Sequence, residues 1–327
     1  MKKKINVGII GRNFGHKVIF RSISKINSFN VYGFSFKNTQ KKINLPKNIK
    51  IFSNWKKLIS EKNIHAVVIS APPRLHEEMI LYAIKKNKHI FCEKPVGKSL
   101  KELSSICKKL ENKKIIHFVN YEFTQIEAFQ EFKKKYFPKI KIKKVKIKWL
   151  VKIPSESRSK WKINHSVGGG NFYNYICHTL FYLEDLFGKI KITNSNLINK
   201  SNKFKLITDF RPENKNIDIN LIFKTIKKKS ELKPQHKIIF YTNRGNFILF
   251  SKAENLNDQF LLLKNSKIIF KPKLIDFDFR IYPTFQNLKS FHQNIRDKKN
   301  RKLNFHTAKR VHLLIDQIIR FKNFSKI

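Results

Sequence analysis

The sequence predicts an α/β protein with two domains. We expect a doubly wound, mostly parallel sheet with helices on both faces, followed by an α+β domain with an open, mainly antiparallel sheet. A length of 327 residues exceeds one ordinary domain. Short apolar runs alternate with helical patterns in the first third, and strand patterns follow one another closely afterwards. We place the boundary between residues 1–120 and residues 121–327.

The first 120 residues are predicted to alternate strands with helices. Ile5 to Ile10 is an apolar run without strict alternation, as expected of a parallel strand covered on both faces. A glycine turn follows, and apolar residues from Val18 to Ile26 recur at helical spacing, so strand, turn and helix come in order. Further strands are predicted at Asn30 to Phe36, Ala66 to Ser70 and His89 to Cys92, with helices at Trp55 to Glu61 and His76 to Lys86.

The turn after the first strand is a candidate nucleotide-binding loop. It contains Gly11, Asn13, Phe14 and Gly15, and it approaches the G-x-G-x-x-G pattern with Asn13 at the second glycine and a shorter spacing. Glycines at a helix N-terminus let backbone N–H groups approach a pyrophosphate. Asn tolerates left-handed geometry better than other non-glycine residues, so we expect Asn13 to preserve the turn. Taken alone, the loop also fits an ordinary strand–helix turn.

The end of the second strand bears on the choice of cofactor. Dinucleotide-binding folds place an acidic residue about 20 residues after the loop, where it binds the adenosine ribose. This strand instead ends with Ser35, closely followed by Lys37, and both could bind a 2′-phosphate. The sequence therefore predicts NADP or NAD with a slight preference for NADP. Lys37 is equally well explained as a surface lysine in a lysine-rich chain.

Two motifs follow the predicted strands. Glu93-Lys94-Pro95 comes directly after the strand ending at Cys92, and Pro73 and His76 follow the strand before it. A second motif runs from Trp161 through Gly168-Gly169-Gly170 to His178. With these motifs the chain resembles the Gfo/Idh/MocA oxidoreductases, the family of glucose-fructose oxidoreductase and inositol dehydrogenase.

The resemblance implies a Rossmann domain that binds a nicotinamide dinucleotide and a second domain that binds substrate. The chain departs from the family at Asn174, which replaces an Asp, and at Ile176, which replaces a glycine. The family strand beside the nicotinamide resembles Phe118 to Phe123, which places Asn120 near the cofactor. The predicted cofactor-binding residues are Gly11, Asn13, Phe14, Gly15, Ser35, Lys37, Pro73, His76, Glu93, Lys94 and Asn120.

Lys94 is the predicted acid/base. Oxidation of an alcohol needs a base within hydrogen-bond distance of the hydroxyl, and open α/β sheets bind ligands at the carboxyl ends of their strands. His178 follows Asn174 by four residues, so on a helix both side chains project from one face. Because Asn174 lacks the negative charge of the family's Asp, we assign proton transfer to Lys94 and assistance to His178. Lys94 also fits a surface lysine, and His178 a core histidine.

Substrate contacts are predicted for polar residues on both sides of the glycine motif. Arg158 and Lys162, which precede it, are candidates for binding an anionic or polyhydroxyl compound. The predicted substrate-binding residues are Lys94, Arg158, Lys162, Asn174 and His178.

The second domain is predicted to form its sheet from consecutive strands. Lysines alternate with apolar residues over Lys139 to Lys152, and hairpin-length gaps such as Asn243 to Asn246 favour antiparallel pairing. One face would carry a helix from Asn171 to Phe187, and the other could pair, so the resemblance implies a homo-oligomer through this sheet. Further strands are predicted at Lys189 to Leu197, Phe204 to Phe210, Ile217 to Thr225, Lys237 to Thr242 and Phe247 to Ser251, with helices at Leu288 to Arg296 and Thr307 to Arg320.

The composition is strongly basic, with 70 Lys and Arg against 22 Asp and Glu and a net charge of +48. The lysines are spread along the chain without a basic arm, and Lys, Ile, Asn and Phe are over-used together, which indicates compositional bias rather than a nucleic-acid partner. Cys92, Cys107 and Cys177 form no metal-binding or disulfide pattern. Apolar runs are too short for a membrane span. We expect a cytoplasmic protein without metal, nucleic-acid or membrane binding.

The predicted function is that of an NAD(P)-dependent oxidoreductase acting on CH–OH groups. It would move a hydride between a nicotinamide cofactor and a hydroxyl or carbonyl carbon of a sugar, inositol or nucleotide-sugar-like substrate. The alternative is a non-catalytic nucleotide-binding or regulatory protein of the same fold, which the departures at Asn13, Asn174 and Ile176 suggest.

Overall fold

The computed structural model describes residues 4–36, 44–152, 164, 167–200, 203–227, 230–255, 258–273 and 278–321. The chain divides into two compact units, each built from separate stretches of sequence. The first crossing between the units, after Glu122, lies close to the predicted boundary at residue 120. Unit 1 is Met1–Glu122, Asn164–Asn174 and Arg280–His312, and unit 2 is Phe123–Ile163, Tyr175–Phe279 and Leu313–Ile327.

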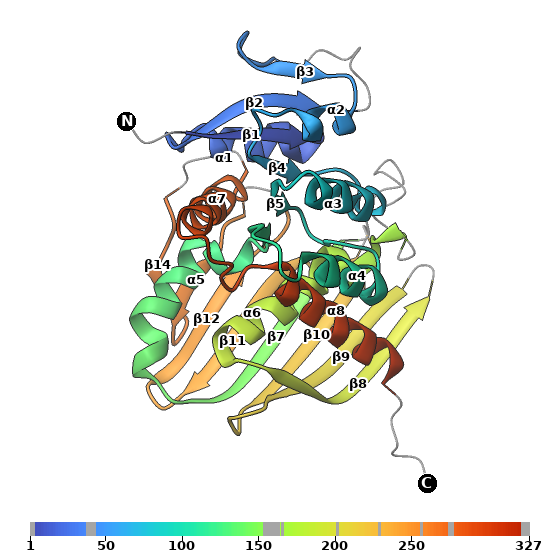
Figure 1. The fold of residues 1–327 in the computed structure, drawn as a ribbon. Coiled ribbons are helices and arrows are strands. Elements are labelled where there is room, and N and C mark those ends of the chain that lie inside the picture. Colours follow the sequence, from blue (N-terminus) through green and yellow to red (C-terminus); the bar gives the residue numbers. More distant parts are fainter. Residues whose placement is uncertain are drawn as a thin grey trace. The chain divides into compact units, whose positions relative to one another are not determined.

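Unit 1 is built on a parallel sheet, which has six strands in the described part of the chain (Figure 1). The strand order β3-β2-β1-β4-β5-β6 reverses direction between β1 and β4 and so creates a topological switch point. This is the doubly wound arrangement predicted from the sequence. The strands are β1 Ile5–Ile10, β2 Phe29–Ser35, β3 Lys50–Phe52, β4 Ala66–Ile69, β5 His89–Cys92 and β6 His117–Val119.

Helices cover the central strands of unit 1, which explains why these strands are apolar on both faces. Val7, Ile9 and all four residues of β4 are buried. Helix α4 is missing from our prediction, although Ser99 accepts the N–H of Glu102 as an N-terminal cap. The helices here are η1 Gly15–Phe20, α1 Arg21–Ile23, α2 Trp55–Ser60, η2 Pro73–Leu75, α3 His76–Lys85 and α4 Leu100–Leu110.

Two C-terminal helices also contribute to unit 1. Helix α7 spans Ile281–Arg296, and the first part of α8, Phe305–Arg320, belongs to the same unit. Phe291 of α7 is fully buried, and its ring lies 5.6 Å from Phe91 and 6.0 Å from Phe118, measured between centroids. Burial of these aromatic rings attaches α7 to strands β5 and β6.

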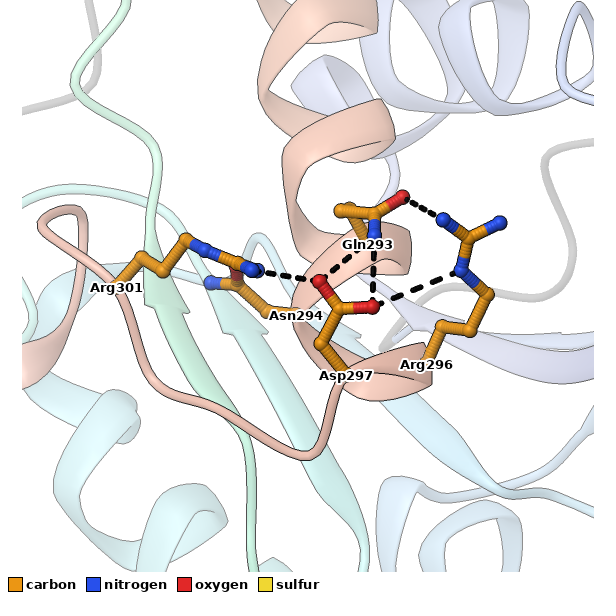
Figure 2. Close-up of polar contacts among 5 residues, drawn as sticks. All are labelled: Gln293, Asn294, Arg296, Asp297 and Arg301. Carbon is orange, nitrogen blue, oxygen red and sulfur yellow. Dashed lines mark hydrogen bonds and ion pairs between the residues drawn. The ribbon is translucent and has the colours of Figure 1, made fainter.

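The turn after α7 is held by a carboxylate (Figure 2). Gln293 Nε2 donates to both carboxylate oxygens of Asp297 at 2.7 Å, and Arg301 Nη2 donates to one of them at 2.6 Å. Beyond this turn, the N–H of Val119 in β6 donates to the carbonyl of Leu303 at 3.0 Å. The turn therefore returns the chain to the edge strand of the parallel sheet.

Unit 2 contains a mainly antiparallel sheet, as predicted (Figure 1). Among the described residues it has eight strands in the order β14-β13-β12-β11-β7-β10-β9-β8, and only β10 and β7 pair in parallel. The strands are β7 Ile142–Lys152, β8 Ile190–Lys200, β9 Lys203–Pro212, β10 Asp218–Ile226, β11 Gln235–Thr242, β12 Gly245–Ser251, β13 Leu261–Lys264 and β14 Lys267–Phe270.

Helical segments cover one face of this sheet. The Phe132 ring lies 4.3 Å from Phe240 of β11, and the Phe123 ring lies 5.4 Å from Trp149 of β7, measured between centroids. The covering segments are η3 Phe123–Gln125, α5 Glu127–Glu131, η4 Phe132–Tyr136, η5 Phe137–Lys139 and α6 Cys177–Phe187.

No described helix combines the length and the apolar character of a membrane span.

Candidate functional site

The turn after β1 requires glycine at its first position. Gly11 has φ of 119°, and a Cβ on this residue would lie 2.3 Å from the carbonyl oxygen of Ser70. A Cβ on Gly15 would lie 3.3 Å from the Ile9 side chain, so this residue lets the helix pack closely on the strand. The two glycines therefore meet the same steric demands as the first and last glycines of a dinucleotide-binding turn.

Asn13 does not use the left-handed geometry that asparagine tolerates. Asn13 is not among the described residues with positive φ; it begins the helical segment that continues through η1. The turn survives because Gly11 alone supplies the positive φ that the chain needs. The N–H groups of Asn13, Phe14 and Gly15 belong to the first helical turn, where backbone donors can bind an anion.

Two serines lie beside this turn. The carbonyl of buried Ser35 accepts the N–H of Gly11 at 3.0 Å. The buried hydroxyl of Ser70 has no hydrogen-bond partner among the described residues, and it lies 3.7 Å from the place of a Cβ on Gly15. No motif marks Ser70. First-turn donors and a spare hydroxyl at the switch point fit a dinucleotide. Lys37 lies outside the described residues, so 2′-phosphate binding stays a prediction.

Lys94 is the second residue after β5, at the carboxyl edge of the parallel sheet. Its Nζ donates to the backbone carbonyl of Asn174 at 3.0 Å. The structure thus brings together two of the three residues predicted to act in catalysis. The contact uses the main chain of Asn174, so it does not depend on whether the side chain is Asn or Asp.

Pro73 begins η2 and His76 begins α3, the two helices that follow β4. His76 is fully buried, with Nδ1 2.8 Å from the carbonyl oxygen of Pro95 and Nε2 2.8 Å from that of Ala71. Burial lowers the pKa of His76, and the neutral ring donates to one of these carbonyls. A Cβ on Gly168 would lie 2.7 Å from Pro73 Cβ, so the two motifs are in contact. Cofactor binding by Pro73 and His76 stays a prediction.

Glu93 and Asn120 form a polar cluster at the same sheet edge. Asn120 Nδ2 donates to Glu93 Oε1 at 2.5 Å, and Asn120 Oδ1 accepts from Asn287 Nδ2 at 2.8 Å. Thr284 Oγ1 accepts from Asn120 Nδ2 at 3.3 Å and lies 3.4 Å from Glu122 Oε1. Burial and the neighbouring Glu122 raise the pKa of Glu93 to about 8. Thr284 and Asn287 come from α7, and no sequence motif identifies them.

His178 lies in unit 2 and is buried. Its ring centroid is 4.5 Å from that of Phe123. Asn174 and His178 belong to one helical stretch, which is π-helical over Phe172–Ile176 and α-helical over Cys177–Phe187. The projection of both side chains from one face and the convergence of His178 with the predicted base stay predictions.

Two predicted substrate ligands cannot be placed. Arg158 and Lys162 lie outside the described residues, together with Trp161 of the second motif. Their roles therefore stay predictions.

Comparison with known proteins identifies relatives. Residues 5–121 match an oxidoreductase family with an NAD-binding Rossmann fold, Gfo/Idh/MocA. An uncharacterized oxidoreductase of Synechocystis sp. is 25% identical over 200 residues, which are 59% of this chain and 54% of that protein. Levoglucosan dehydrogenase of Pseudarthrobacter phenanthrenivorans is 33% identical over 82 residues, 25% of this chain and 21% of the enzyme. The matched region thus spans about half, or less, of these curated relatives.

Solved structures share the fold along almost the whole chain. An oxidoreductase from Thermotoga maritima superimposes with a TM-score of 0.79 at 16% identity, covering 97% of this chain and 96% of that one. Levoglucosan dehydrogenase in complex with NADH and L-sorbose gives 0.74 at 16% identity, with coverage of 97% and 96%. A 3-ketoreductase from Actinomadura kijaniata in complex with NADP gives 0.76 at 12% identity and covers 97% of both chains. At these identities the likeness shows the fold alone.

Proposed function

Because residues 5–121 match the Gfo/Idh/MocA oxidoreductase family, we propose that the chain is an NAD(P)-dependent dehydrogenase or reductase acting on CH–OH groups. Its substrate would be a sugar, an inositol or a nucleotide-sugar-like compound. The observation that carries the proposal is Lys94, held at the carboxyl edge of the sheet by the Asn174 carbonyl. The names of two relatives, levoglucosan dehydrogenase and myo-inositol 2-dehydrogenase, support this substrate class.

The chain's own residues would orient the substrate and move a proton. The bound cofactor supplies the hydride acceptor or donor at its nicotinamide ring. Lys94 Nζ takes the hydroxyl proton during oxidation and returns it during reduction. Its hydrogen bond to the Asn174 carbonyl orients the amine, while His178 and the Asn174 side chain would hold the reacting oxygen. Arg158 and Lys162 would bind the rest of the substrate.

The cofactor in this proposal is NADP or NAD, with a slight preference for NADP. The absence of an acidic residue at the end of β2, together with Ser35 and Lys37, supports the preference. Affinities of NADPH and NADH, measured by fluorescence titration, test it. Equal affinities would contradict the preference without affecting the proposed reaction.

Turnover with and without Lys94 tests the reaction. Nicotinamide absorbance is followed over a panel of sugars, inositols and nucleotide sugars, for wild type, Lys94→Ala and the control Lys101→Ala, an exposed lysine of α4. Loss of a general acid/base should lower kcat about 10²- to 10⁴-fold. Cofactor affinity should change little, and the control should behave as wild type. Full activity of Lys94→Ala contradicts the mechanism. Cofactor binding by wild type without any turnover would favour the non-catalytic alternative.

A homo-oligomer in the cytoplasm is also part of the proposal. Exposed side chains of β7, which alternate with its buried residues, leave one face of the unit 2 sheet open in the part of the chain that the structure describes, and this supports an interface between copies. Cys92, Cys107 and Cys177 are buried and form no disulfide with one another, which supports a reducing compartment. Fractionation of cells producing the native chain tests the location, and recovery outside the cytoplasm would contradict it.

A further inference from the structure

Arg280 places a positive charge beside the glycine turn of unit 1, although it lies more than 260 positions after that turn in the sequence. It directly precedes α7 and is half-buried. Its guanidinium lies over the ring of Phe14, with Cζ 5.0 Å from the ring centroid. Phe14 belongs to the first helical turn after Gly11, whose backbone N–H groups are the proposed pyrophosphate donors. The guanidinium therefore packs against a side chain of the proposed binding turn.

The same guanidinium also acts on Glu93. Burial and the charge of Glu122 raise the pKa of Glu93, and Arg280 is among the groups that oppose this rise. Phe14 follows β1 and Glu93 follows β5, while β4 lies between these strands. Arg280 therefore contacts the segment after β1 and acts electrostatically on the residue after β5, on the two sides of the switch point where a dinucleotide crosses the sheet edge in this type of fold.

The chemistry of arginine suits this position. A planar guanidinium can stack on an aromatic ring and still direct its N–H donors outward in its own plane. Two of these donors match two oxygens of a phosphate group. A lysine would provide the charge without the planar pair of donors.

We propose that Arg280 binds the pyrophosphate of the dinucleotide, so that the segment Arg280–His312 completes the cofactor site of unit 1. This inference rests on the proposed function, because it assumes that NAD(P) binds at the glycine turn. Phe14 is a positioning residue, since its ring supports the guanidinium.

Cofactor binding by Arg280 variants tests the proposal. Titrations use NADH or NADPH, whichever binds wild type more tightly, and its nicotinamide-free fragment, ADP-ribose or the 2′-phosphate of ADP-ribose. Arg280→Gln should weaken both ligands about tenfold or more, because both contain the pyrophosphate. Arg280→Lys and Phe14→Leu should lose less affinity for both ligands than Arg280→Gln does. Arg296→Gln, an exposed change at the other end of α7, should leave both affinities unchanged.

The outcomes separate this inference from the proposed function. If wild type binds neither ligand, the proposed function fails. If wild type binds both and Arg280→Gln binds them equally well, the inference on Arg280 is overturned while the function stands. A loss confined to the complete cofactor also overturns it, since Arg280 would then serve the nicotinamide. If Arg280→Gln does not fold, the affinities of Arg280→Lys are used instead. If Arg280→Lys binds both ligands as tightly as wild type, the inference is overturned.

Discussion

Lys94 shows how a residue identified by its sequence neighbours depends on a partner far away. Its position after a buried strand and before Pro95 identifies it within a few residues of sequence. The acceptor of its side chain is the carbonyl of Asn174, 80 positions along the chain. Because this acceptor is backbone, replacing the family's Asp by Asn leaves the contact intact.

Gly168 is expected to be sensitive to a single added carbon. Gly168→Ala places a Cβ 2.7 Å from Pro73 at a φ of 80°, so it combines a clash with a conformation that costs about 1–3 kcal/mol. Gly188→Ala is the matched control, because Gly188 has φ of 82° and nothing within 4 Å of the added Cβ. Thermal unfolding should show the larger loss for Gly168→Ala. Equal losses would contradict contact between Gly168 and Pro73.

Glu93 should make stability fall as the pH rises. Its pKa is raised from 4.5 to about 8, so between these values the folded state holds a proton that the unfolded chain has lost. Stability then decreases with increasing pH across this window. Glu93→Gln keeps an acceptor for Asn120 and removes the titration, so its free energy of unfolding should decline less between about pH 5 and pH 8. Urea unfolding at several pH values measures this, and identical slopes for both proteins would contradict it.

Strand β7 places several of the chain's lysines in the middle of the unit 2 sheet. Lys144, Lys146 and Lys148 are exposed, whereas Val145 and Ile147 between them are buried. In the strand order β7 lies between β11 and β10. The lysines therefore form a positive row along the centre of the sheet face opposite the helices.

This lysine row should make self-association depend on salt. If two copies pair through this face, like charges approach each other, and screening should favour the oligomer as the Debye length falls from about 10 Å at 0.1 M to about 3 Å at 1 M salt. Lys146→Gln should strengthen association at low salt, and Lys101→Gln on unit 1 should not. Sedimentation equilibrium measures both. Association that weakens with salt would place the interface elsewhere.

At the scale of the whole molecule, the basic composition of the chain has little influence on its fold. A net charge of +48 coexists with an apolar core, because the lysines of β7 lie on the exposed positions of an alternating strand. Strands of ordinary length follow their predicted positions, since periodicity is readable over such runs. Among the described strands, β3, with three residues, and β13 and β14, with four each, are mostly exposed or half-buried, unlike the equally short but largely buried β4 and β5. They are the strands missing from our prediction.

By itself the sequence determined the order of the longer strands and most of the helices, the glycine turn and the position of Lys94, because these depend on spacing between near neighbours. Only the tertiary structure decided that Arg280–His312 joins unit 1. It also decided which residues hold Asn120, since Thr284 and Asn287 are 164 and 167 positions away. Such contacts arise when a complete helix packs on a complete sheet, and no local pattern specifies which distant side chains that packing will bring together.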